Sequence, residues 1–135
     1  ICWSYRFRIA RWNKMSYDIS YRVQCKDDPK LWADVGNCEA NITYNLREMI
    51  QESTGLEWKN EEDNGLVKDV IPFIIHGLEE LERFPDKYKQ YESPNGWGTI
   101  SGCKNFFTRC ILDWTTFTED SWTSPYKDIV HFWIV

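Results

Sequence analysis

Two histidines and five cysteines are the side chains of this sequence that could support nucleophilic or metal chemistry. They are His76, His131, Cys2, Cys25, Cys38, Cys103 and Cys110. No two cysteines have C-x-x-C spacing, and neither histidine stands in an H-x-x-x-H or H-E-x-x-H setting, so we predict no metal site. An odd number of scattered cysteines is typical of free thiols in a reducing compartment. An enzyme that uses a cysteine and a histidine stays open as an alternative, because such partners need not be close in sequence.

Motifs of known catalytic mechanism are missing from the sequence. It contains neither the G-x-S-x-G turn of a nucleophilic serine nor a G-x-G-x-x-G loop that would hold phosphates. Carboxylates are abundant in the runs Glu61-Glu62-Asp63 and Glu79-Glu80, but such runs usually form solvated faces of helices and loops. We therefore predict no catalytic residue and no cofactor.

One polar set lies just before a predicted helix. Asn41, Thr43 and Asn45 surround Tyr44 in the run N-I-T-Y-N. The start of a helix has free N–H groups that can bind an anion or a peptide carboxylate. The competing interpretation, which we favour, is that the polar side chains only cap the helix and bond to the backbone. We keep these four residues as candidate binding residues.

A second candidate set lies in the run S-P-N-G-W-G-T, where Trp97 stands between two glycines. Asn95 belongs to the turn that precedes it. An exposed indole there could be a contact platform for a ligand, and a buried one would pack on the first turn of the following helix. We expect Trp97 to be buried, and we add Asn95 and Trp97 to the candidate binding residues.

The charge of the chain is unevenly distributed. The net charge is −5, and residues 1–14 hold four basic side chains and no acidic one, which leaves −9 for the remainder. A body this acidic repels phosphates, so direct binding to nucleic acid is disfavoured. It would suit a basic protein partner, although a net negative charge also simply keeps a small protein in solution.

Hydrophobic periodicity predicts the helices. Asn45 and Glu48 have the spacing of a capping box for a helix over 46–54, which Gly55 would end. A helix over 67–83 follows from a stripe at i, i+3, i+4 and i+7. Its members are Val67, Val70, Ile71, Ile74, Ile75, Leu78 and Leu81. The last predicted helix spans 99–114 with Thr99 as its N-cap, and residues 56–65 and 115–125 are predicted loops.

Two runs predict a small sheet. Residues 16–24 alternate in the manner of a half-buried strand, and residues 129–135 are apolar on both faces, as in a strand inside a sheet. Together with the helices, these runs predict an α+β domain in which three main helices cover one face of a small antiparallel sheet.

The length of 135 residues predicts one domain over 15–135. Residues 1–14 have two interpretations. They are either a non-native extension, with Met15 as the natural start, or a strand in which Trp3, Tyr5, Phe7 and Ile9 alternate with polar or small residues. We favour the first.

No stretch approaches the roughly 18 apolar residues that a membrane span requires, and no signal peptide is visible. We therefore predict a cytoplasmic protein without membrane contact.

Three short motifs occur in a recognisable order: M-S-Y-D at Met15 to Asp18, N-I-T-Y-N at Asn41 to Asn45, and N-G-W-G at Asn95 to Gly98. In this order they resemble a loosely defined group of short bacterial and phage proteins of unknown function. The resemblance covers roughly residues 15–114. It implies a bacterial, cytoplasmic, mobile-element origin and brings no established reaction.

Three functions follow as hypotheses. The first is a small acidic interaction protein that binds, and in one form inhibits, another protein. The second is a binder of small ligands or carbohydrates that uses the indoles of Trp58, Trp97 or Trp122. The third is the cysteine- and histidine-dependent enzyme.

Overall fold

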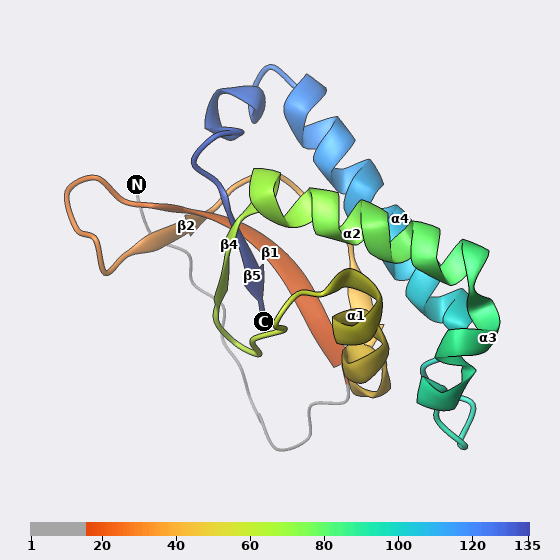
Figure 1. The fold of residues 1–135 in the computed structure, drawn as a ribbon. Coiled ribbons are helices and arrows are strands. Elements are labelled where there is room, and N and C mark those ends of the chain that lie inside the picture. The colour runs from red at the N-terminus through yellow and green to blue at the C-terminus, as the bar shows by residue number, and fades with distance from the viewer. Residues whose placement is uncertain (1–15) are drawn as a thin grey trace.

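The computed structural model describes residues 16–135, which form five strands and four α-helices (Figure 1). The strands are β1 Ser16–Gln24, β2 Trp32–Asp34, β3 Asn41–Thr43, β4 Asp63–Leu66 and β5 His131–Ile134. The helices are α1 Arg47–Thr54, α2 Val67–Arg83, α3 Pro85–Tyr88 and α4 Ile100–Glu119. The predictions made for residues 1–14 and for a start at Met15 lie outside the described residues.

The sheet is antiparallel at every described pairing. Its order is β2-β1-β5-β4, and β3 pairs with the N-terminal end of β1. Tyr21 of β1 lies opposite Phe132 of β5, which places the C-terminal strand between β1 and β4. The apolar run at the end of the chain therefore becomes an interior strand next to residues 17–23, as predicted.

Alternation along β1 decides which face of the sheet the helices cover. Tyr17, Ile19, Tyr21 and Val23 are buried on one face. The ring of Tyr21 contacts that of Phe117 in α4 edge-on, with 5.5 Å between the ring centroids. The predicted fold class is confirmed: α1, α2 and α4 are the main helices, and they pack on one face of the antiparallel sheet (Figure 1).

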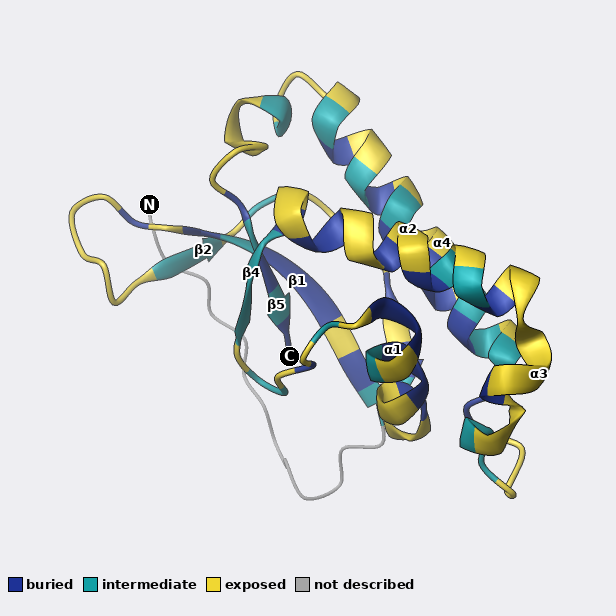
Figure 2. Cartoon of the chain, in the orientation of Figure 1, coloured by how far each residue is buried: buried dark blue, intermediate teal, exposed yellow. Residues whose placement is uncertain are grey.

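Helix α2 has the bounds that its apolar stripe predicted. Val67, Val70, Ile71, Ile74 and Leu81 are buried along it, and Figure 2 shows buried and exposed segments alternating along α2 and α4. Ile75 was wrongly included in the buried stripe, because it is exposed. Gly77 is buried instead, where a Cβ would lie 2.9 Å from the ring of Phe107. The missing side chain of Gly77 thus lets α2 approach α4 closely.

Helix α4 begins where predicted and ends later. Thr99 is its N-cap, but the helix continues to Glu119 rather than ending at residue 114. The prediction of a loop over 115–125 was therefore wrong for residues 115–119. Phe117 explains the extra turn, because its ring stacks on Trp114 at 5.7 Å and is buried against the sheet.

The start of α1 differs from the predicted capping box. A 3-10 turn over Tyr44–Leu46 precedes the helix, so Asn45 lies inside a turn instead of before one. The side chain of Thr43 caps this turn by accepting from the Asn45 N–H at 3.5 Å. Leu46, at the N-cap of α1, makes no side-chain capping bond. The predicted end at Gly55 is confirmed by its left-handed φ of 78°.

Two short strands escaped prediction. Residues 56–65 were predicted as a loop, but Asp63–Leu66 pairs with β5, and Trp32–Asp34 pairs with the C-terminal end of β1. Neither run has the β-branched alternation that marks a strand. Among residues 16–135, no helix combines the length and the apolar composition needed to cross a bilayer.

Candidate functional site

The two candidate sets from the sequence meet at the N-terminal end of α4. Gly98 packs against Asn45 so closely that a Cβ on Gly98 would lie 2.8 Å from the Cβ of Asn45. The same Cβ would lie 3.1 Å from the carbonyl carbon of Asn45. The N-I-T-Y-N and N-G-W-G segments, far apart in the sequence, therefore meet at this contact.

Trp97 is 60% exposed, so the expectation that it is buried was wrong. The Asn95 side chain holds the turn, since its Oδ1 accepts from the Trp97 N–H at 2.9 Å and from the Ser93 hydroxyl at 2.7 Å. Gly98 has a φ of +85°, which side chains rarely allow. The Asn95 bonds and the Gly98–Asn45 contact thus order the backbone on both sides of Trp97, while its indole lies on the surface.

Tyr44, the neighbour of Asn45 in sequence, is a second exposed aromatic side chain near the Gly98–Asn45 contact. It is 38% exposed, and its ring lies over that of Tyr17 with centroids 4.1 Å apart. Burial raises the pKa of Tyr17, so the phenol beneath Tyr44 stays neutral at physiological pH. We call Tyr44, Asn45, Asn95, Trp97 and Gly98 the aromatic surface.

Several polar groups beside the aromatic surface already have partners. Asn41 donates to the Asp18 carboxylate at 2.6 Å. At the start of α4, Thr99 Oγ1 accepts from the Gly102 N–H and Glu92 Oε2 accepts from the Ile100 N–H, both at 3.0 Å. A carboxylate of the chain itself therefore occupies the helix N-terminus where an anion would bind. The groups that this surface offers to a partner therefore include its aromatic rings.

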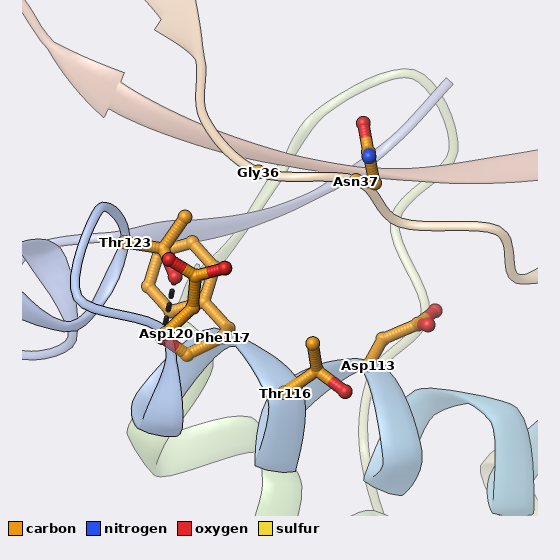
Figure 3. Close-up of a pocket in the computed structure, with 7 residues that line it drawn as sticks. All are labelled: Gly36, Asn37, Asp113, Thr116, Phe117, Asp120 and Thr123. Carbon is orange, nitrogen blue, oxygen red and sulfur yellow. Dashed lines mark hydrogen bonds between the residues drawn. The ribbon is translucent and has the colours of Figure 1, made fainter.

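The opposite end of α4 borders a cavity of about 280 Å³, which we call the α4 cavity (Figure 3). Figure 3 shows side chains of α4 directed towards the segment that follows β2. The lining residues are Gly36, Asn37, Asp113, Thr116, Phe117, Asp120 and Thr123. Trp122, which is 86% exposed, lies between two of them in sequence. This cavity is polar, in contrast to the aromatic surface.

Asp113 is the most deeply placed charged group of the α4 cavity. It is 8% exposed, and its Oδ2 accepts from the Cys38 thiol at 3.3 Å and from the Glu39 N–H at 3.1 Å. Burial, reinforced by the charge of Asp113, raises the pKa of Cys38. The thiol therefore stays protonated at neutral pH and serves as a donor rather than as a nucleophile.

The groups that an enzyme would need lie in separate places. His76 borders a cavity of about 350 Å³ with Thr54, Pro72 and Phe73, which supply neither a thiol nor a carboxylate. His131 pairs with Asp63, 2.9 Å from Nδ1 to Oδ2, and its ring contacts Trp32. Cys38 lies with Asp113 near α4. Within residues 16–135, no three metal-binding side chains form a group.

The described cysteines are all free thiols. Cys103 and Cys110 are buried in the core, which fits their predicted role as small apolar residues of α4. Trp58 is 2% exposed and packs edge-on against Phe106 and Phe132. Burial removes this indole from the set that a small ligand could contact.

Sequence reasoning missed the α4 cavity. Its signal was present at Asp113, an acidic residue three positions after Cys110 on the buried stripe of a helix. An acid in such a stripe needs a polar partner, because an unpaired buried charge is costly. The partner, Cys38, is 75 residues away, so periodicity alone could not identify it.

No protein-family model, curated protein or solved structure matches this chain.

Proposed function

We propose that this chain is a protein-binding domain that contacts its partner through the aromatic surface at the N-terminal end of α4. One observation carries the proposal: Trp97 is 60% exposed, although its loop is fixed by the Asn95 bonds and the Gly98–Asn45 contact. A mobile exposed indole could be incidental. An exposed indole on an ordered backbone is instead available as a preformed contact.

Tryptophan and tyrosine supply much of the binding energy at protein interfaces, because each covers a large area with few rotatable bonds. A contact that is already ordered loses less entropy on binding. Trp97 and Tyr44 lie on segments that meet at Gly98 and Asn45, so one partner surface can reach both.

The charge of the chain indicates the kind of partner. Beyond residue 14 the net charge is −9, which attracts a basic protein and speeds its association. Our proposal includes the bacterial, mobile-element setting that the motif resemblance implies, with a partner in the cytoplasm. Inhibition would follow if the aromatic surface covers a site that the partner uses.

Affinity capture with matched variants tests the proposal. Tagged wild-type protein, Trp97→Ala and Trp122→Ala are used to capture proteins from a lysate of the organism that encodes the chain, with quantification by mass spectrometry. We expect a stoichiometric partner that is retained by Trp122→Ala and lost by Trp97→Ala. Retention by Trp97→Ala at the wild-type level would contradict the proposal, as would recovery of no stoichiometric partner.

In the carbohydrate-binding alternative, only Trp97 and Trp122 of the three candidate indoles remain, because Trp58 is buried. Trp97 and Trp122 are exposed, but they flank opposite ends of α4. A helix of 20 residues is about 30 Å long. The two indoles therefore cannot stack on one small sugar, and a sugar would have to bind at either indole alone.

A further inference from the structure

We infer that Asn95 is a site of spontaneous deamidation, which converts its side-chain amide to a carboxylate and alters the turn that orders Trp97. The inference does not depend on the proposed protein-binding function, because it concerns the covalent chemistry of the chain itself. The sequence contains two Asn-Gly pairs, Asn64-Gly65 and Asn95-Gly96. The structure leaves the second pair reactive and blocks the first.

Deamidation of an Asn-Gly pair consumes only water. The backbone nitrogen of the glycine loses its proton to base and forms a bond to the Cγ of the asparagine, and the Cγ–Nδ2 bond breaks as ammonia leaves. Water then opens the resulting succinimide ring at one of its two carbonyl groups. The product is aspartate, or isoaspartate in which the main chain runs through the former side chain. Glycine favours the reaction because it has no side chain to hinder the approach of its nitrogen.

The nucleophile of the Asn95-Gly96 pair is accessible. Both residues are exposed, and a Cβ on Gly96 would have no neighbour within 4 Å, so base can reach the nitrogen. The Gly96 N–H donates to the Ser93 carbonyl at 3.2 Å, which is at the long end of the usual range for such a bond. A neutral acceptor at this distance holds the proton only weakly, so the nitrogen can be deprotonated while the turn is intact.

The electrophile of the same pair is activated by the turn. Asn95 Oδ1 accepts from the Trp97 N–H at 2.9 Å and from the Ser93 hydroxyl at 2.7 Å. Negative charge develops on this oxygen when the nitrogen attacks Cγ, and donors that already point at it stabilise that charge. Asn95 Nδ2 donates to no acceptor among residues 16–135, so no described group holds the ammonia that must leave.

The Asn64-Gly65 pair has the opposite arrangement. Asn64 Nδ2 donates to the Lys59 carbonyl at 2.8 Å and to the Glu62 carbonyl at 3.0 Å, which holds the leaving group in place. The Gly65 N–H donates to the Asp63 carboxylate at 2.8 Å, and an anionic acceptor keeps that proton on the nitrogen. Both residues also belong to β4, which pairs with β5. Reaction at Asn64 therefore requires local opening of the sheet edge.

Either product changes the turn before Trp97. Aspartate keeps an oxygen that can accept from the Trp97 N–H, and it adds one negative charge. Isoaspartate inserts an extra carbon into the main chain, so the acceptor is no longer in position for the Trp97 N–H and the Ser93 hydroxyl. The bonds that order the backbone before Trp97 are then lost, and the reaction is a one-way change that accumulates with the age of the protein.

Incubation of the folded protein in mildly alkaline buffer, followed by peptide mass spectrometry, tests the inference. Trypsin places the two pairs on different peptides, residues 60–68 and 90–104, and electron-transfer fragmentation distinguishes isoaspartate from aspartate. We expect conversion at Asn95 at least about tenfold faster than at Asn64, since Asn64 must first lose several hydrogen bonds. In urea the two pairs should react at similar rates. Equal rates in the folded protein, or an Asn95 that reacts only after unfolding, would overturn the inference.

A variant of Ser93 tests the activation of Asn95. Ser93→Ala removes one donor to Oδ1 and should slow conversion at Asn95 about fivefold, as expected for loss of one neutral hydrogen bond. Ser101→Ala, on the exposed first turn of α4, is the matched control and should leave the rate unchanged. An unchanged or faster rate for Ser93→Ala would contradict activation by the turn.

A variant of Asp63 tests the protection of Asn64. Asp63→Asn keeps an acceptor for the Gly65 N–H but removes the charge, so conversion at Asn64 should become about fivefold faster, the difference between a charged and a neutral hydrogen bond. The unaltered Asn95 on the other peptide is the internal reference. Conversion at Asn64 that is no faster in this variant would contradict the assigned protection.

The consequence for Trp97 is measured on the product. The isoaspartate form is separated by ion exchange, and its Trp97 backbone order parameter is compared with those of the fresh protein and of Asn95→Asp, which keeps the acceptor. We expect a lower order parameter in the isoaspartate form alone. An isoaspartate form with the same Trp97 order parameter as the fresh protein would contradict the change assigned to the turn.

Discussion

The two ends of α4 are built in opposite ways. At the N-terminal end, Thr99 and Glu92 accept from two of the free N–H groups of the helix, those of Gly102 and Ile100, and the indole of Trp97 is exposed nearby. At the C-terminal end, acidic residues replace the basic ones that usually compensate a helix, and a polar cavity opens. One helix therefore offers an apolar contact at one end and an unneutralised negative field at the other.

The contrast shows how one helix can separate two kinds of recognition. The polar requirements of the N-terminal end are met internally, so what remains for a partner is aromatic area. At the C-terminal end the Thr116 and Phe117 carbonyls accept hydrogen bonds, but no basic side chain of the last turn balances the negative end of the helix, so what remains there is charge.

The largest loss of stability is expected on substitution of Gly98, the glycine at which the two motifs meet. Gly98→Ala should lower the free energy of unfolding by about 2–4 kcal/mol. It places a side chain on a residue with a left-handed backbone conformation, and its Cβ would clash with Asn45. Gly96→Ala has a similar φ of +81° but no neighbour within 4 Å, so it should lower stability by about 1–2 kcal/mol. Urea denaturation measures both. Equal losses would mean that the Gly98–Asn45 contact is not tight.

The next effect concerns Asp113. Asp113→Ala leaves the Glu39 N–H and the Cys38 thiol without an acceptor and should lower stability by about 1–3 kcal/mol. Asp120→Ala removes an exposed carboxylate and should lower it by less than about 1 kcal/mol. Thermal and urea unfolding of both variants measure the difference. A loss of stability for Asp120→Ala as large as that for Asp113→Ala would contradict the structural role of the buried Asp113 carboxylate.

The reactivity of Cys38 should report on the same carboxylate. Burial raises the pKa of this thiol first, and the negative charge of Asp113 raises it further. Because the thiolate is the reactive form, Asp113→Asn should lower the pKa and shift the pH profile of iodoacetamide alkylation to lower pH. Cys103, whose pKa is raised by burial alone, is the internal control and should not shift. A profile of Cys38 that stays unchanged would show that Asp113 does not act on the thiol.

The smallest expected change in the free energy of unfolding is electrostatic, and it has opposite sign at the two ends of α4. Glu119→Gln removes a negative charge from the last turn of α4 and should stabilise the protein by about 0.3–1 kcal/mol at low salt. Ser101→Lys adds a positive charge to the first turn and should destabilise it by a similar amount. Both variants change the net charge by one unit. A gain from both would show that the general acidity of the protein, rather than the helix ends, decides their effect.

Features set by neighbouring residues could be predicted from the sequence. The alternation of Tyr17 to Val23, the stripe of α2 apart from Ile75, and the Thr99 cap each depend on spacing within one element, and all three are present in the structure. The arrangement of three helices on an antiparallel sheet followed from them.

Features that depend on contacts between distant segments could not be predicted from the sequence. Gly98, next to the exposed Trp97, packs on Asn45 from another segment, and Asp113 is tolerated in a buried stripe because Cys38 and Glu39 donate to it. Strand β4, with the sequence D-N-G-L, forms because β5 lies beside it rather than through its own propensity. Both candidate sites therefore depend on tertiary contacts that periodicity does not report.

A preformed contact at the N-terminal end of α4 requires Trp97 to be both exposed and immobile. Nitrogen-15 relaxation of the Trp97 backbone amide and indole N–H, assigned with Trp97→Phe, measures the immobility, and quenching of the indole signal by a soluble paramagnetic agent measures the exposure. We predict an order parameter near 0.85, the value of rigid backbone, together with strong quenching. An order parameter below about 0.6, or an indole protected from the agent, would contradict a preformed contact at this end of α4.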